Sequence, residues 1–109
     1  MKIVRVDDDH IVFDTGDVIT YDHEQDCCEV NYADFKQLDD IAKAHVFREP
    51  MAFESIEGKG FRFGNPGAMF FVPCYSVQNG YYSYNVDIYF NGNRVLDCWC
   101  EGKDDDIYM

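Results

Sequence analysis

Short runs of alternating apolar and polar residues occupy the beginning of the chain. Residues 2–6 and 10–13 are rich in β-branched side chains and are separated by three consecutive aspartates, a pattern typical of a β-hairpin. Residues 14–17 predict a second turn, because Gly16 can adopt a positive φ at little cost. Residues 18–21 then predict a third strand.

The repeat of apolar positions changes after residue 30 from a two-residue to a helical spacing. This change predicts the one short helix of the chain, about three turns long, with an apolar face that packs against a sheet. Asn31 is a suitable N-cap, and Asp34 in the first turn complements the helix dipole. The apolar face consists of Tyr32, Phe35, Leu38, Ile41 and Ala42.

The following segments predict further strands. Residues 45–56 are an extended candidate that Pro50 interrupts, so they form an edge strand or two short strands. Residues 61–63 form a short strand, and the apolar run 69–72 is expected to end at Pro73. The turn signals between these segments are Gly64-Asn65-Pro66-Gly67 and Asn79-Gly80.

The clearest strand covers residues 82–90, and Asn91-Gly92-Asn93 after it predicts a hairpin turn. A three-residue loop places Cys98 opposite Val86 and keeps the apolar residues of both strands on one face. A two-residue loop would instead bring Asp97 beside Val86, so we predict the longer loop. The expected cross-strand pairs are Leu96–Ile88, Cys98–Val86 and Cys100–Tyr84.

These elements together predict an α+β fold: a mostly antiparallel curved sheet or partial barrel with one short helix packed against it. A chain of 109 residues indicates a single compact domain, and residues 103–109 are expected to form a frayed tail. The chain has neither the pattern of a signal peptide nor an apolar run of membrane-spanning length. We therefore expect a cytoplasmic protein whose five cysteines are reduced.

The negative net charge of the chain limits the kinds of molecule that it is expected to bind. The net charge is −12; residues 1–42 carry twelve acidic and three basic side chains, a net of −9, whereas residues 43–95 carry a net of +1. Such a field repels phosphates, so we expect no binding to nucleic acid or to anionic membranes. A basic protein partner remains open, and so does a purely solubilising role of the charge.

The densest group of reactive side chains is His23-Glu24-Gln25-Asp26-Cys27-Cys28-Glu29. In a catalytic interpretation, Cys27 or Cys28 is the nucleophilic thiolate, His23 its base, and Asp26 or Glu29 the group that orients the base. The chain shows neither a recognisable oxyanion hole nor a glycine-rich cofactor loop. We therefore commit to no catalytic residue and favour a protein that is not an enzyme.

A metal-binding interpretation uses the same thiols. Zinc prefers four nitrogen or sulfur ligands in a tetrahedron, but the usual Cys-x-x-Cys spacing is absent. A third interpretation needs neither metal nor catalysis. One of Cys27 and Cys28 points into the core, Cys98 and Cys100 are small core side chains, and Asp26 or Glu29 caps the helix at Asn31 or bonds to nearby backbone N–H groups. We expect no cofactor, and zinc is the ion that a ligand set would take. The candidate ligands are His23, Cys27, Cys28, Cys74, Cys98 and Cys100.

Tyrosines gather around the expected turn at Asn79-Gly80. Tyr75, Tyr81 and Tyr82 cannot all be buried cheaply, because each hydroxyl needs a hydrogen-bond partner. Tyrosines around a loop suit protein recognition, since they offer a large contact area at low entropic cost. An ordinary aromatic sheet face is the alternative explanation.

The motif His-x-Gln-Asp-Cys-Cys-Glu, formed here by His23, Gln25, Asp26, Cys27, Cys28 and Glu29, resembles the hallmark of an uncharacterised family of small bacterial and phage proteins. The strand at residues 81–90 and its hairpin are similar too. The resemblance implies a bacterial or phage setting and one compact domain, and it transfers no catalytic role. We expect a non-enzymatic, acidic binding or accessory protein with a protein partner or a second copy of itself. The alternative is a metal- or thiol-dependent site on His23, Cys27 and Cys28.

Overall fold

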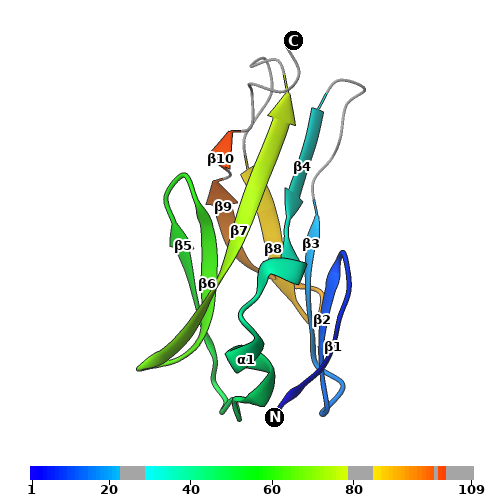
Figure 1. Ribbon diagram of the computed structural model, residues 1–109, viewed down its shortest axis with the longest axis vertical. Helices are drawn as coiled ribbons and strands as arrows, with labels where there is room; N and C mark the ends of the chain where they lie inside the picture. Colours follow the sequence, from blue (N-terminus) through cyan, green and yellow to red (C-terminus); the bar gives the residue numbers. More distant parts are fainter. Residues whose placement is uncertain (23–28, 79–84, 100, 103–109) are drawn as a thin grey trace.

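Two sheets of mostly antiparallel strands make up the computed structural model, which describes residues 1–22, 29–78, 85–99 and 101–102 (Figure 1). The first sheet has the order β1-β2-β3-β8-β9, and the second has the order β10-β7-β6-β5, with β4 also paired to β7. The parallel pairing of β10 with β7 is the exception to the antiparallel rule. The strands are β1 (Ile3–Val6), β2 (His10–Phe13), β3 (Val18–Asp22), β4 (Glu29–Ala33), β5 (Ala52–Ile56), β6 (Gly60–Asn65), β7 (Ala68–Gln78), β8 (Asn85–Phe90), β9 (Asn93–Trp99) and β10 (Glu101–Gly102).

The predicted antiparallel sheet is thus confirmed, but the fold is mostly sheet rather than α+β. In the described part of the chain, helix is limited to a 3-10 turn, η1 (Phe35–Gln37), and to α1 (Asp40–Ala44). The sheets do not close into a barrel. Their end strands β5 and β9 lie next to each other, yet they are not neighbours in a hydrogen-bonded ladder.

The hydrophobic core lies between the sheets and is rich in phenylalanine. Phe47, which follows α1, is at its centre: its ring packs against those of Phe13, Phe63 and Phe70 at centroid distances of 5.6–5.7 Å. Backbone hydrogen bonds between Met1 and Phe47 in both directions hold this segment beside the start of the chain. The completely buried large side chains are Phe13, Phe35, Phe47, Phe61, Phe63, Ile11, Ile19, Ile88, Val72 and Val86.

The helix predicted from Asn31 onward is wrong. Residues 29–33 form β4, which gains a full ladder of hydrogen bonds to β7, with Tyr32 opposite Tyr75. The predicted burial of Phe35, Leu38 and Ala42 is nevertheless confirmed, because the segment of η1 and α1 packs these side chains into the core. Ile41, in contrast, is 67% exposed, so the expected continuous apolar face does not exist.

Two predicted strand boundaries also differ. Of the extended segment 45–56, only β5 is a strand, and it is an end strand as expected. The run 69–72 does not end at Pro73, because β7 continues to Gln78. Pro73 is tolerated where β7 changes partners: it is the last residue paired with β6, and Cys74 is the first one paired with β4. A missing N–H is least harmful at such a junction.

The C-terminal hairpin has the predicted register but a shorter loop. Val86 lies opposite Cys98 and Ile88 opposite Leu96, as expected. Phe90, however, pairs with Asn93, so the loop has two residues, and a bulge at Val95 restores the apolar register. The first two hairpins of the chain are confirmed. The predicted turn Asn79-Gly80, residues 82–84 of the predicted strand and the tail 103–109 lie outside the described residues.

Candidate functional site

Most of the reactive motif lies outside the described part of the chain. His23, Asp26, Cys27 and Cys28 are not described, so their catalytic and metal-binding roles stay predictions. Glu29 begins β4, where its backbone pairs with Gln78. Cys100, Tyr81 and Tyr82 are likewise outside the described residues.

Tyr75 is a described member of the predicted tyrosine surface, and part of its side chain has a structural role. Its ring packs beside that of Tyr32 on the neighbouring strand, at a centroid distance of 5.6 Å. Gln37 donates hydrogen bonds to the Tyr75 hydroxyl and to the Asp34 carboxylate. Tyr75 is only half-buried, so it joins the β4–β7 pair to η1 and still presents surface to solvent.

Cys98 is completely buried, as predicted, and it meets a cysteine from the other sheet. The Sγ atoms of Cys74 and Cys98 are 3.4 Å apart, and both residues have no solvent-exposed surface. Cys74 is on β7, and Cys98 is on β9. The structure therefore brings together two of the six candidate zinc ligands.

The turn between β1 and β2 gathers two carboxylates and an imidazole that sequence reasoning did not single out. His10 Nδ1 is 2.6 Å from Asp9 Oδ1 and 3.2 Å from Asp7 Oδ1. Partial desolvation raises the pKa of Asp7, but hydrogen bonds from the Asp9 backbone N–H and from His10 outweigh it, so the net pKa is lowered. Within the described ranges, this is the one group of three metal-binding side chains close enough to share an ion. Its contacts are those of a stabilised, solvent-exposed turn, so we assign it no ligand.

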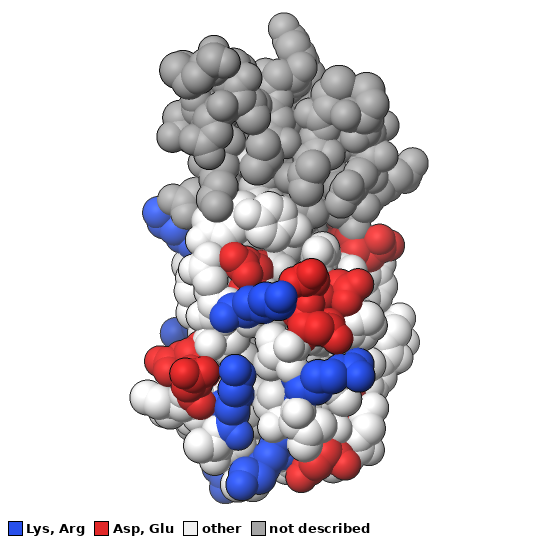
Figure 2. All heavy atoms as spheres, turned by 45° about the vertical axis from the view of Figure 1, so that its right-hand side comes forward, with Lys and Arg blue, Asp and Glu red and all other residues white. Residues whose placement is uncertain are grey.

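The acidic surface expected from the sequence is broken up by basic side chains. On the face shown in Figure 2, lysine and arginine side chains lie among acidic ones. Two ion pairs involve the β1–β2 turn: Lys36 Nζ of η1 lies 2.9 Å from Asp8, and Arg5 Nε of β1 lies 3.3 Å from Asp7 within the same hairpin. Both are exposed and contribute little to stability. Their effect is to divide the negative charge into small patches.

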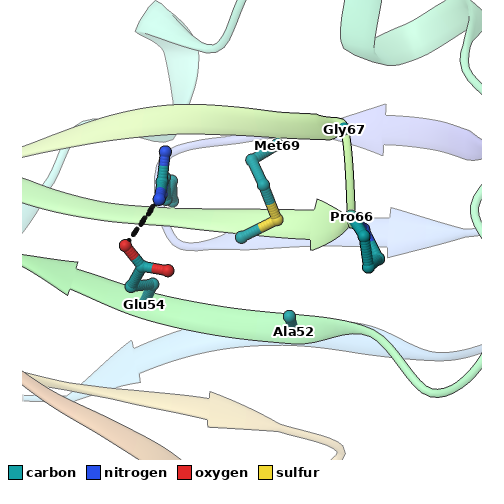
Figure 3. Close-up of a pocket in the computed structure, with 6 residues that line it drawn as sticks. Ala52, Glu54, Pro66, Gly67 and Met69 are labelled. Atoms are coloured by element: carbon teal, nitrogen blue, oxygen red, sulfur yellow. Dashed lines mark hydrogen bonds and ion pairs between the residues drawn. The ribbon is translucent and has the colours of Figure 1, made fainter.

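A groove lies on the outer side of the second sheet (Figure 3). Its volume is about 480 Å³. It is lined by Ala52, Glu54, Arg62, Pro66, Gly67 and Met69.

Strand register explains where this groove forms. Cross-strand pairing places Ala52, Gly64 and Met69 in one row and Glu54, Arg62 and Phe71 in the next. Gly64 has no side chain, and a Cβ there would be 2.3 Å from the Ala68 carbonyl oxygen. The Met69 side chain extends from β7 over β6 (Figure 3). A hollow therefore remains between Met69 and the small side chain of Ala52.

An ion pair closes one end of the groove. Arg62 donates from Nε and Nη2 to a single oxygen of Glu54, Oε1, at 3.1 and 2.6 Å. The second carboxylate oxygen, Oε2, makes no hydrogen bond within the described part of the structure. Phe71, beside Arg62 in the same row, is 44% exposed. The groove thus combines the apolar side chains of Ala52 and Met69 with an available carboxylate oxygen, and the exposed ring of Phe71 lies beside it.

Sequence reasoning missed this groove for a specific reason. The alternation in residues 52–56 and 60–65 could have revealed one buried and one outward face. It could not reveal that Glu54 and Arg62 meet, because that depends on the turn between β5 and β6. The exact pairing places Ile56 opposite Gly60 and hence Glu54 opposite Arg62.

None of the helices in the described residues is long and apolar enough to cross a membrane.

Comparisons with other proteins add no further constraint on the site. The similarity of the cysteine motif to a bacterial and phage family stays a prediction. Searches of protein-family models, curated proteins and solved structures gave no match to this chain.

Proposed function

We propose that the chain is a non-enzymatic binding protein that holds an extended, basic segment of a partner protein in the groove of the β5–β6–β7 sheet. The observation that carries the proposal is the outward-facing combination of Ala52, Met69, exposed Phe71 and the Glu54–Arg62 pair. One apolar side chain of the partner fills the hollow. A neighbouring lysine or arginine of the partner bonds to Glu54 Oε2.

The shape of the groove favours a protein segment over a small molecule. Small-molecule sites are enclosed cavities that cover most of the ligand surface. This groove lies on an open sheet face, where a side chain from a partner can enter while the rest of the partner covers the rim. Such a central apolar anchor surrounded by polar contacts is the usual anatomy of a protein interface.

Charge favours a basic partner. The chain carries a net charge of −12, which attracts basic proteins over a distance and repels acidic ones. Within the groove, Arg62 is already paired with Glu54, whereas one oxygen of that carboxylate remains available. The proposal thus retains the acidic binding protein expected from the sequence and moves its centre to β5 and β6.

An array of synthetic peptides that vary separately in net charge and apolar content tests this proposal. Peptides with one large apolar residue next to lysine or arginine should bind most tightly. Ala52→Trp should block the groove and weaken that binding at least tenfold. Val4→Trp is the matched control, because Val4 is a 62% exposed apolar residue on β1, outside the groove.

Two results would contradict the proposal: equal binding by Ala52→Trp and the unmodified chain, or a preference for acidic peptides. If all binding persists in Ala52→Trp but is lost on Tyr81→Ala with Tyr82→Ala, the tyrosine surface is the binding site instead. Circular dichroism of each variant shows whether the fold is retained, so that unfolding is not mistaken for lost contact.

A further inference from the structure

Two buried thiols face each other across the interface between the sheets. Cys74 lies on β7 of the second sheet and Cys98 on β9 of the first, with their Sγ atoms 3.4 Å apart. They are not joined by a disulfide. The backbone on both sides is fixed by ladder pairing, with Cys74 opposite Ala33 and Cys98 opposite Val86. The contact therefore belongs to the core and is not an encounter of two loops.

The described residues supply a dithiol at this position and not a set of three ligands. A structural zinc ion needs four ligands. Among the described residues, no third histidine, cysteine or carboxylate atom approaches both sulfurs closely enough to complete a group of three. What the site does offer is two sulfurs that need to approach by only roughly 1.3 Å to reach bonding distance.

We propose that Cys74 and Cys98 form a redox-active pair that hydrogen peroxide converts into a disulfide linking the two sheets. One thiolate sulfur attacks a peroxide oxygen, and the O–O bond breaks to give a sulfenic acid and hydroxide, which takes up a proton. The second sulfur then attacks the sulfenic sulfur and displaces its hydroxyl group as water. In total, two thiols and one peroxide yield one disulfide and two waters, and two electrons pass from sulfur to peroxide.

Burial determines which oxidant can act. Both cysteines have no exposed surface, so a bulky disulfide such as oxidised glutathione cannot reach either sulfur in the closed structure. Peroxide is small enough to enter when the sheets separate transiently. The resulting bond would connect residues 24 positions apart in the sequence and hold β7 against β9. The oxidised protein should consequently resist unfolding better than the reduced one.

Peptide mapping of the whole chain tests the pairing directly. Reduced protein is treated with hydrogen peroxide, its remaining thiols are alkylated under denaturing conditions, and it is digested with trypsin. Cleavage at Arg62, Arg94 and Lys103 places Cys74 alone in peptide 63–94, while peptide 95–103 contains Cys98 and Cys100. We expect these two peptides to be joined, with a mass equal to their reduced sum minus two hydrogen atoms plus one alkyl group, which is carried by Cys100.

Cys100→Ala is the decisive control, because any bond between the two peptides in this variant must involve Cys98. The link should persist in Cys100→Ala and disappear in Cys98→Ala, and a thiol reductant should reverse it together with the gain in unfolding midpoint. Loss of the link in Cys100→Ala would overturn the proposal. A link from Cys74 to Cys27 or Cys28, or alkylation of both Cys74 and Cys98 after peroxide treatment, would overturn it as well.

Discussion

Asn65 shows how one side chain can replace part of a strand pairing. It is 5% exposed at the end of β6. Its Oδ1 accepts a hydrogen bond from the Arg48 N–H at 2.9 Å, and its Nδ2 donates to the Arg48 carbonyl oxygen at 2.7 Å. The amide thus satisfies both backbone groups of Arg48 and fixes the irregular segment that carries Phe47 into the core.

Replacing Asn65 with alanine should lower the free energy of unfolding by about 2 kcal/mol, because two partly buried backbone groups lose their partners. Urea denaturation followed by tryptophan fluorescence or circular dichroism measures the change. Asn93→Ala removes an amide of the same size from an exposed position and should change stability by less than about 0.5 kcal/mol. Equal effects of the two variants would show that the Asn65–Arg48 pairing has no special role.

At the residue scale, the sequence predicted burial better than it predicted contacts. The inward positions Val86, Ile88 and Cys98 were correct, because strict alternation along a strand determines its two faces. The neighbour of Cys98 could not be predicted: Cys74 lies in a different sheet, and no local pattern encodes that approach. Likewise, the imidazole of His10 bonds to Asp7 and Asp9 because of the detailed turn geometry, which side-chain spacing does not define.

At the element scale, hairpins were predictable and the helix was not. Hairpins depend on local turn residues, so the pairs β1–β2 and β2–β3 followed from the sequence. The secondary structure of residues 29–33 depends on β7, which is some forty residues away in the sequence. Residues 29–33 pair there with Gln78 to Cys74. Helical spacing of apolar residues was a correct sign of burial but a wrong sign of secondary structure, since a strand followed by η1 and α1 buries several of the same side chains.

Asn91 connects two turns that are distant in the sequence. It has a positive φ of 53° in the β8–β9 turn. Its Nδ2 donates to Asp17 Oδ1 at 2.8 Å, and its Oδ1 accepts from the Val18 N–H at 2.9 Å. Asp17 also accepts from the Thr15 hydroxyl at 2.6 Å. This cluster, which we term the turn clamp, joins the β2–β3 turn to the C-terminal hairpin of the same sheet.

Asn91→Gly should destabilise the protein by about 1 kcal/mol through loss of both side-chain hydrogen bonds. Glycine tolerates the positive φ, so this variant separates the clamp from backbone strain. Asn91→Asp should be worse, because its carboxylate would face that of Asp17. The measurement is the urea midpoint of each variant at neutral pH. An Asn91→Asp variant as stable as Asn91→Gly would argue that Asp17 does not interact with this position.

At the scale of the whole molecule, both proposed sites depend on how the sheets are assembled. The groove needs the register of three strands, and the thiol pair needs two sheets to face each other. Sequence patterns indicated most of the strands, though not β4, and the negative charge, but not the order β10-β7-β6-β5. The groove that we propose as the binding surface therefore could not be located from the sequence, because it depends on Arg62, Glu54 and Met69 lying together.

Net charge and the turn carboxylates make opposite contributions to stability as pH changes. At pH 7 the chain carries a charge of −12, and its isoelectric point is about 4.3, so acidification first relieves repulsion in the folded state. The hydrogen bonds from Thr15 and Asn91 lower the pKa of Asp17, and those from Asp9 and His10 overcome desolvation to lower that of Asp7. A carboxylate with a lowered native pKa stabilises the fold above its unfolded pKa of about 3.9.

Below that pH the unfolded chain binds more protons than the native one, so this stabilisation decreases as pH approaches the native pKa values. We expect the urea midpoint to rise from pH 7 toward pH 5 and to fall below about pH 4. Added salt at pH 7 should raise the midpoint by screening repulsion. Asp17→Asn should reduce the decrease of the urea midpoint below about pH 4. Asp40→Asn, which removes a carboxylate whose side chain is 94% exposed, should leave this decrease unchanged. A midpoint that is constant from pH 5 to pH 3 would show that neither turn carboxylate is coupled to folding.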